Sequence, residues 1–328
     1  MDYPLGGVVH DVDVSDDGQY VAAPYPGPNA SIDPTGAPNL VLLDRAGAVV
    51  WKRTVFGESP TATIYGQQVR VGSSGPTAVK FSHDARSLAY GTGSGQLVVI
   101  DRATQAVRWR DFLRDQVRAI SWSGGDGRIY ASSGDNDVYA LDAATGTVLW
   151  RTDVGGWSIA WAASKHYLLA NAKQGYAITA VRLPDGTVAW RYPSVETSYG
   201  LAISPDESAF ASVNATNTAP GTVLFDRRGR LLWAVPEQGN AVAFSGNSRY
   251  LLTEANTGNP RGAPDRLDLY SAKTGELVWS RPLSDRSTVW NGGSSAVLYL
   301  SNDASTILAG NPDGGFVYFF KGRVTPRK

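Results

Sequence analysis

Few residues in this chain could transfer protons or bind a metal ion. It has three histidines, His10, His83 and His166, and no cysteine. A Ser-His-Asp triad would depend on His10, and Asp11 adjoins it, but neighbouring residues in a strand point to opposite sides. His83 and His166 fall in predicted turns on the opposite face of the fold from His10. The sequence therefore predicts neither a triad nor a histidine-rich metal site.

An acidic cluster around Ser15 resembles a cation-binding site. Asp11-x-Asp13-x-Ser15 is similar to the start of a calcium-binding loop. The valines between these residues keep the alternation of a strand, however, and no glutamate follows at the spacing that such a loop requires. Asp16-Asp17-Gly18 is typical of a hairpin turn. The cluster therefore predicts a strand and a turn, and we expect no metal and no cofactor.

Composition excludes several classes of function. The 328 residues include 30 Lys+Arg and 30 Asp+Glu, so no basic surplus favours nucleic acid. No run of about 18 apolar residues could span a membrane, and without cysteine there is no disulfide or thiol catalysis. Met1-Asp2-Tyr3-Pro4 does not begin a signal peptide. We therefore expect a cytoplasmic protein, or an extracytoplasmic one from which an export segment was removed.

The candidate residues lie within an internal repeat that has two signals. A glycine stands four residues before a tryptophan in five copies, and a sixth has Gln105 before Trp109. The five pairs are Gly47/Trp51, Gly146/Trp150, Gly186/Trp190, Gly229/Trp233 and Gly275/Trp279. Glycine supplies the positive φ of a tight hairpin. The tryptophans are expected to pack between neighbouring units, because a repeated aromatic residue is usually core.

The second signal is an apolar strand that ends at a serine and a polar turn. It occurs at Ser15, Ser82, Ser123, Ser204, Ser245 and Ser301, with Ala162 in place of serine in one copy. The residues one and three positions earlier are apolar in all seven copies, which is the period of a strand. Four strands in each unit of about 41 residues predict an all-β, seven-bladed β-propeller of four-stranded antiparallel blades. We expect residues 1–328 to form this single domain.

The seventh copy is incomplete at its outer strand. Phe316–Phe320 is predicted as its third strand, with Gly322 at the following turn, but Pro326 stands where tryptophan is expected. Proline is poor in a paired strand. Residues 2–5 are predicted to supply the missing strand, and Val324 onward is the alternative.

The segment Ala140–Trp150 (ALDAATGTVLW) closely resembles the repeat of the pyrroloquinoline-quinone-like (PQQ-like) propeller family. Turns such as Ser204-Pro205-Asp206 also resemble those of WD-type propellers. The resemblance implies a quinoprotein-like fold shared by quinone-dependent dehydrogenases, outer-membrane assembly scaffolds and sensor domains. The dehydrogenases of this family have eight blades, a calcium site, a catalytic aspartate and usually adjacent cysteines. No catalytic motif of theirs matches this chain residue by residue, so the resemblance favours a binding scaffold.

The propeller prediction separates two faces. The connections B–C and D–A emerge on one face, here called the loop face, and the turns A–B and C–D emerge on the other, the turn face. The long insertions all belong to the loop face: residues 24–38, 56–75, 214–221, 256–265 and 284–294. Irregular connections on a rigid scaffold often bind ligands, although drift in unselected loops would give the same pattern.

The predicted site is the channel mouth on the loop face. Five residues before the aligned serine, the seven copies have His10, Thr77, Arg118, Trp157, Tyr199, Asn240 and Ala296. This position varies, whereas the position two residues later is uniformly apolar. Tyr65 and Trp290, in long loops, could add aromatic contacts. The alternatives are a water-filled channel and loops that pack on themselves.

Two hypotheses follow from these patterns. The first is a non-catalytic scaffold that binds a protein or a carbohydrate through the loop face, in an extracellular or other extracytoplasmic setting, without nucleic acid or membrane insertion. The second is a quinone- or metal-dependent oxidoreductase, or a propeller lactonase or lyase. Its chemistry would have to come from His10, Asp11 and Glu254. The sequence favours the first hypothesis.

Overall fold

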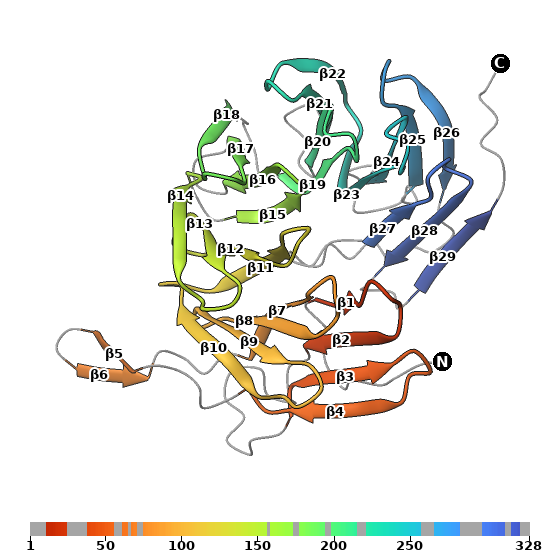
Figure 1. Cartoon of the computed structure of the whole chain (residues 1–328). Coiled ribbons are helices and arrows are strands. Elements are labelled where there is room, and N and C mark those ends of the chain that lie inside the picture. The colour runs from red at the N-terminus through yellow and green to blue at the C-terminus, as the bar shows by residue number, and fades with distance from the viewer. Residues whose placement is uncertain are drawn as a thin grey trace. The chain divides into compact units, whose positions relative to one another are not determined.

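The protein consists of strands and turns throughout the part of the chain that the structure, a computed structural model, describes (Figure 1). That part comprises residues 11–24, 38–55, 61–64, 67–70, 75–155, 158–172, 177–193, 198–214, 221–256, 266–282, 297–311 and 316–321. No helix in these ranges could span a membrane. The chain divides into two compact units, Met1–Asp153 and Val154–Lys328. The single domain over residues 1–328 stays a prediction.

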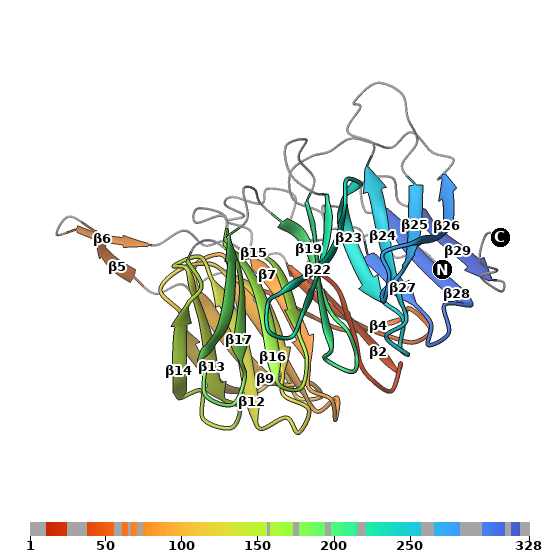
Figure 2. The ribbon, with the colours of Figure 1, turned by 90° about the horizontal axis from the view of Figure 1, so that it is seen from above.

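The first unit holds three four-stranded antiparallel sheets, whose strands follow one another in chain order. Blade one has β1 (Asp13–Val14), β2 (Tyr20–Pro24), β3 (Leu40–Asp44) and β4 (Val49–Arg53). Blade two has β7 (Pro76–Phe81), β8 (Ser87–Thr92), β9 (Gln96–Asp101) and β10 (Val107–Phe112). Blade three has β11 (Val117–Trp122), β12 (Arg128–Ser133), β13 (Asp137–Asp142) and β14 (Val148–Asp153). In Figure 2 the short turns of this unit lie together at one end of the strands.

The second unit holds three further four-stranded sheets and one of three strands. Blade four has β15 (Ser158–Ala163), β16 (Tyr167–Ala172), β17 (Ala177–Arg182) and β18 (Val188–Pro193). Blade five has β19 (Ser198–Ile203), β20 (Ala209–Asn214), β21 (Thr222–Asp226) and β22 (Leu231–Val235). Blade six has β23 (Gln238–Phe244), β24 (Tyr250–Asn256), β25 (Arg266–Ser271) and β26 (Leu277–Pro282). Blade seven has β27 (Val297–Leu300), β28 (Thr306–Asn311) and β29 (Phe316–Lys321).

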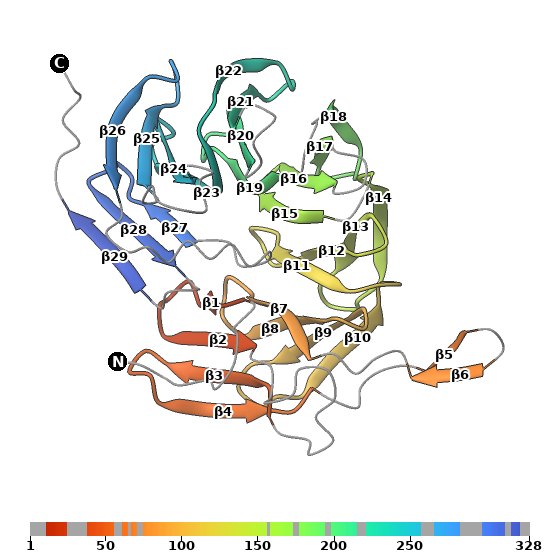
Figure 3. The same ribbon diagram turned by 180° about the vertical axis from the view of Figure 1, so that it is seen from behind.

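These seven sheets confirm the predicted fold class, an all-β propeller of seven blades. In blade seven, β29 is the outer strand among the described residues (Figure 3). The two segments proposed to complete that blade, residues 2–5 and Val324 onward, lie outside the described residues. Which of them supplies the fourth strand stays a prediction.

The repeated serines close the A–B turns, which explains why the sequence repeats them. In blade two the Ser82 amide donates to the Ser87 carbonyl at 3.1 Å, and the Ser87 amide donates to Ser82 Oγ at 2.9 Å. Ser82 Oγ in turn donates to Asp84 at 2.7 Å, so the hydroxyl satisfies the polar groups of a tight turn. Equivalent serine-capped turns begin at Ser15, Ser123, Ser204, Ser245 and Ser301.

Blade four departs from the sequence alignment. Its turn is closed by Ser164, whose amide donates to the Tyr167 carbonyl at 2.8 Å, so the turn is two residues shorter than in the other blades. The alignment of Ala162 with the repeated serine was therefore wrong. A two-residue shift makes Ile159, and not Trp157, the counterpart of Arg118 in this blade. A shorter turn does not disturb the alternation of apolar residues in the strands on either side of it. That alternation therefore could not reveal the two-residue shift.

The glycine and tryptophan of the first repeat signal meet across neighbouring blades. Trp109 of blade two donates from Nε1 to the Ala143 carbonyl in the C–D turn of blade three, at 2.8 Å. Gly146 of that turn has φ +77°, and a Cβ there would lie 2.6 Å from Trp109 Cε3. The indole therefore lies flat against a glycine that must lack a side chain. The same contact joins Trp190 to Gly229 and Trp233 to Gly275.

The hydrophobic core lies between successive blades. One cluster joins blade two, through residues such as Leu97 and Trp109, to blade three, through Ile129 and Leu141, all of which are buried. A second joins blades one and two, and others join blades four and five, five and six, and six and seven. Truncating a large buried side chain of this kind costs about 3–5 kcal/mol. This packing gives the strand ends a stable scaffold.

One element of the first unit was not expected from the sequence. The connection between blades one and two contains a hairpin, β5 (Thr61–Ile64) and β6 (Gln67–Arg70), which forms a two-stranded sheet of its own. From the sequence, residues 56–75 are expected to form one long irregular insertion. Two short runs around the dipeptide Tyr65-Gly66 were the available signal, since two-residue turns with glycine connect hairpins.

Candidate functional site

In four of the A strands the predicted channel-mouth position coincides with a β-bulge. In β7, Pro76 pairs with Thr92 and Ala78 with Gly91, so Thr77 is an extra residue. In β11 the register shifts in the same way around Arg118. The register of β19 shifts around Tyr199, and that of β23 shifts at Asn240 and Ala241. A bulge bends its strand and redirects a side chain, and bulges are frequent beside binding sites.

The bulge in blade two is anchored to the next blade. Thr77 Oγ1 donates to the Val117 carbonyl at the start of β11, at 2.5 Å. Behind this contact, a Cβ on Gly91 would lie 2.4 Å from Val117 Cγ1, so glycine permits the close approach of the two blades. In the first unit, the ends of the A strands that carry the candidate site are thus held by specific contacts.

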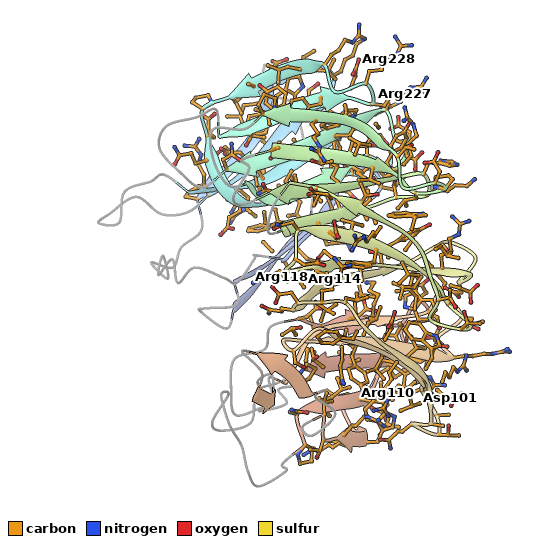
Figure 4. The ribbon with its side chains drawn as sticks, turned by 90° about the vertical axis from the view of Figure 1, so that its left-hand side faces the viewer. Asp101, Arg110, Arg114, Arg118, Arg227 and Arg228 are labelled. Atoms are coloured by element: carbon orange, nitrogen blue, oxygen red, sulfur yellow. The ribbon has the colours of Figure 1, made fainter. Side chains whose placement is uncertain are left out.

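Arg118 has a partly buried guanidinium. Its Nη2 donates to Gln116 Oε1 at 3.0 Å, which links the guanidinium to the connection that precedes β11 (Arg118 is labelled in Figure 4). Burial lowers the pKa of Arg118, and the nearby Asp115 carboxylate opposes this effect. An arginine stays charged under these conditions because its ordinary pKa is so high. The site therefore presents a cation with directional N–H donors.

The connection that precedes Arg118 is locked between two B–C turns. The Leu113 amide donates to the Gly95 carbonyl of blade two at 2.8 Å. On the other side, Ser133 Oγ of blade three donates to the Leu113 carbonyl at 2.6 Å, and the Gly134 amide donates to the Gln116 carbonyl at 2.9 Å. A binding surface built on such a connection loses little conformational entropy when a partner docks.

Acidic side chains lie beside this connection on blade three. Tyr139 OH donates to Asp135 Oδ2 at 2.5 Å, and Arg151 Nη1 lies 3.6 Å from Asp137 Oδ2. Burial, together with the Asp135 charge, raises the pKa of Asp137, and Arg151 opposes that rise. Burial and the bond to Asp135 also raise the pKa of the Tyr139 phenol. The surface therefore offers both signs of charge, which suits polar recognition of a partner.

Of the remaining predicted site residues, the structure describes the backbone of two and nothing of the other four. Tyr199 lies in β19 and Asn240 in β23, at the bulges, but their side chains are not described. The other four, His10, Trp157, Tyr65 and Trp290, lie outside the described residues. Convergence of these side chains on one site stays a prediction. Sequence reasoning did not select Gln116, Asp135 or Tyr139, because Asp135-Asn136-Asp137 has the pattern of an ordinary turn.

Two carboxylates of the acidic cluster in blade one have structural partners. Asp11 Oδ2 accepts from the Val79 amide at 2.9 Å, and Asp13 Oδ2 accepts from the Phe81 amide at 2.8 Å. The Asp13 carboxylate also pairs with the Lys80 ammonium. These bonds join the first strand of blade one to β7. Burial raises the pKa of Asp11 to about 6, against the lowering effect of its backbone hydrogen bonds.

The other ionisable candidates are a buried glutamate and two histidines of the turn face. Glu254 is buried in β24. His83 Nδ1 lies 2.8 Å from Asp126, and His166 Nδ1 lies 2.7 Å from Glu207, so in both cases a turn-face histidine meets a carboxylate of the next blade. Among the described residues, no group of three histidine, aspartate or glutamate side chains could hold a metal ion.

Comparisons with known proteins support the fold and the family. The family model for outer membrane protein assembly factor BamB matches residues 36–217, which is more than half of the chain. No curated protein matches. Among 1852 matching chains of solved structures is one from the crystal structure of the mitotic checkpoint complex. It has a TM-score of 0.68 and 13% identity, over 98% of this chain and 89% of that chain. So widespread a fold does not select a function.

Proposed function

Because the chain belongs to the PQQ-like propeller family of outer membrane protein assembly factor BamB, we propose that it is a non-catalytic scaffold that binds a protein partner. The partner binds the loop face, at the bulged starts of the A strands and the connections beside them. The setting is extracytoplasmic, in keeping with the description of the family.

The contrast between two positions of the A strands supports this proposal most directly. At the bulge the chain has Thr77, Arg118, Tyr199 and Asn240, which share neither size nor charge. Two residues later it has Val79, Ile120, Leu201 and Val242, which are all apolar. A position that only supported the fold would be expected to repeat as the apolar position does. Its variation favours recognition of one particular partner.

The locked connection of blades two and three supports a protein as the partner. Arg118, Asp115 and Asp137 present both charges from a backbone held by hydrogen bonds. Protein interfaces use such charges to orient a partner and to discriminate against wrong ones. A carbohydrate partner would instead depend on aromatic residues for stacking, and Tyr199 is the candidate for that role.

Photo-crosslinking in the native cell tests the proposal. A photoreactive amino acid replaces Arg118 or Tyr199, and the control position is Arg86, an exposed arginine on the turn face. We expect one discrete protein adduct from positions 118 and 199 and none from position 86. The purified adduct partner should then bind R118A/Y199A at least tenfold more weakly than R86A, since truncation at the core of an interface costs 1 kcal/mol or more.

Three results would contradict the proposal. Adducts that form only at position 86 would move the interface to the turn face. Unchanged affinity of R118A/Y199A would remove the bulge positions from the interface. Binding to a glycan array that Y199A abolishes would identify a carbohydrate ligand. Thermal unfolding with and without Ca²⁺ and PQQ tests the enzyme hypothesis separately, since a ligand of the native state raises the melting temperature.

A further inference from the structure

The turn face carries a positively charged hairpin on blade five. The C–D turn between β21 and β22 reads Asp226-Arg227-Arg228-Gly229-Arg230. Asp226 organises it by accepting from the Arg228 amide at 2.8 Å and the Arg230 amide at 3.0 Å, and its carboxylate pairs with the Arg230 guanidinium at 2.6 Å. Among the described residues no carboxylate pairs with Arg227 or Arg228, which lie at the outer edge of the second unit in Figure 4.

Two leucines directly follow the arginines and are exposed. Leu231 is 48% exposed and Leu232 is 51% exposed. The cause is a bulge in β22: Phe225 pairs with Leu231 and Leu224 pairs with Trp233, so Leu232 is an extra residue. The bulge interrupts the alternation that would bury one leucine of the pair. The hairpin therefore combines guanidinium groups with two half-exposed leucine side chains.

Blade five is unusual in charge but not in backbone. The apolar pair recurs in blades one and three, where Val49 and Val50, and Val148 and Leu149, are 40–47% exposed. Three arginines and one aspartate give the blade-five turn a net charge of +2. The corresponding turns, residues 44–48, 101–106, 142–147, 182–187 and 271–276, have net charges of 0, 0, −1, 0 and 0. The positive charge is therefore not a requirement of the hairpin fold.

We propose that the Asp226–Leu232 hairpin contacts an anionic lipid surface. Guanidinium groups bind phosphate through paired N–H donors, and each basic residue near an anionic bilayer increases binding about fivefold. Exposed leucines gain by entering the boundary between headgroups and acyl chains. Arg227 and Arg228 bind the headgroups, and Leu231 and Leu232 enter the boundary.

The rigidity of the hairpin supports this assignment. Trp190 Nε1 of blade four donates to the Arg227 carbonyl at 3.1 Å, and a Cβ on Gly229 would lie 2.7 Å from the Trp190 ring. The hairpin is thus pre-organised without a partner. A lipid surface can contact both parts of it at once, because headgroup phosphates bind the guanidinium groups and the acyl boundary accepts the two exposed leucines. The proposal concerns the turn face and does not depend on the proposed partner of the loop face.

Vesicle co-sedimentation with the full chain tests the proposal. The probes are phosphatidylcholine vesicles and phosphatidylcholine vesicles with one third phosphatidylglycerol, at low and high salt. We expect binding to the anionic vesicles alone, weakened by salt. R227Q/R228Q should reduce the partition coefficient about 25-fold, at about fivefold per arginine, and R227E/R228E should reduce it further. L231S/L232S should also reduce it.

The matched control is V49S/V50S, which alters the equivalent apolar pair beside a neutral turn. It should leave vesicle binding unchanged. Tryptophan fluorescence and the melting temperature of each variant establish that it is folded, and L232S alone replaces the double variant if that one unfolds. Failure of the folded wild-type chain to bind anionic vesicles would overturn the proposal. An equal loss of vesicle binding in V49S/V50S would also overturn the proposal. Loss with the arginine variants but not with the leucine variants would overturn the proposed entry of Leu231 and Leu232 into the boundary and would leave a purely electrostatic contact.

Discussion

The contact between Trp109 and Gly146 predicts an unusually large cost for adding one methyl group. In G146A the new Cβ would lie 2.6 Å from Cε3 and 2.8 Å from Cδ2 of Trp109, which is closer than such atoms can approach. Neither group can move freely. The indole is held by its bond to the Ala143 carbonyl, and the turn is closed by the Gly146 amide, which donates to the Asp142 carbonyl at 2.8 Å.

A second glycine separates the steric cost from the backbone cost. Gly18 has φ +66°, close to the +77° of Gly146, but a Cβ there would meet nothing within 4 Å. The left-handed backbone costs alanine about 1–2 kcal/mol at either position. Overpacking against the indole adds about 1–3 kcal/mol at position 146 only. We therefore expect G18A to lose about 1–2 kcal/mol of unfolding free energy and G146A about 2–5 kcal/mol.

Urea unfolding followed by tryptophan fluorescence measures both losses. The test is completed by W109L, which removes the ring that meets the new methyl group. In the W109L background, the added cost of G146A should fall to that of G18A, because only the backbone cost remains. Equal losses for G18A and G146A in the wild-type background would refute the reasoning. So would an excess cost at position 146 that persists in W109L.

Three further substitutions test buried or paired charges, each by urea unfolding. The pKa of Asp11 is raised to about 6, so between pH 4 and 6 the folded state keeps a proton that the unfolded chain has released. The unfolding free energy of the wild type should therefore fall by about 2 kcal/mol between pH 4 and 7, relative to that of D11N. Parallel plots of unfolding free energy against pH for the two proteins would contradict this. Burial raises the pKa of Glu207, but hydrogen bonds from His166 outweigh this effect and lower the pKa overall. E207A should reduce the unfolding free energy by about 1 kcal/mol or less, because the Glu207–His166 pair lies near the surface. D268A should cost about 3–5 kcal/mol, because Asp268 is fully buried and accepts from Arg266 Nε at 2.8 Å; a loss below 1 kcal/mol would contradict that.

The repeat made the blades predictable because each of its residues has a local role. The serines cap turns that they themselves begin, as Ser82 does with the Ser87 amide, so their spacing gives the A–B turns directly. The tryptophans were predicted to pack between blades, and Trp51 and Trp109 are buried there. The seven sheets follow from such local signals. The shorter turn at Ser164 was not predicted, because it changes the spacing between strands without changing the alternation of apolar residues within them.

Contacts between blades could not be predicted in the same way. The Gly-x-x-x-Trp signal suggests one local unit, but Gly146 contacts Trp109, 37 residues earlier, and not Trp150. Asp13 likewise bonds to the Phe81 amide, 68 residues away. Such pairs depend on the packing of one sheet on another, which no period within a blade specifies. The bulge at Arg118 was also hidden, because an extra residue shifts register only in relation to a partner strand.

The departures from the repeat support both proposals, and they are of two kinds. At the A-strand bulges the backbone repeats while the side chains differ, as with Thr77 and Arg118. At the blade-five hairpin the backbone and the apolar pair repeat while the charge differs. Neither change is needed by the scaffold, because sister blades fold without it. A scaffold that distributes its stability over many equivalent contacts can vary single positions at little cost. Selection for a partner can therefore act on the loop face and the turn face independently.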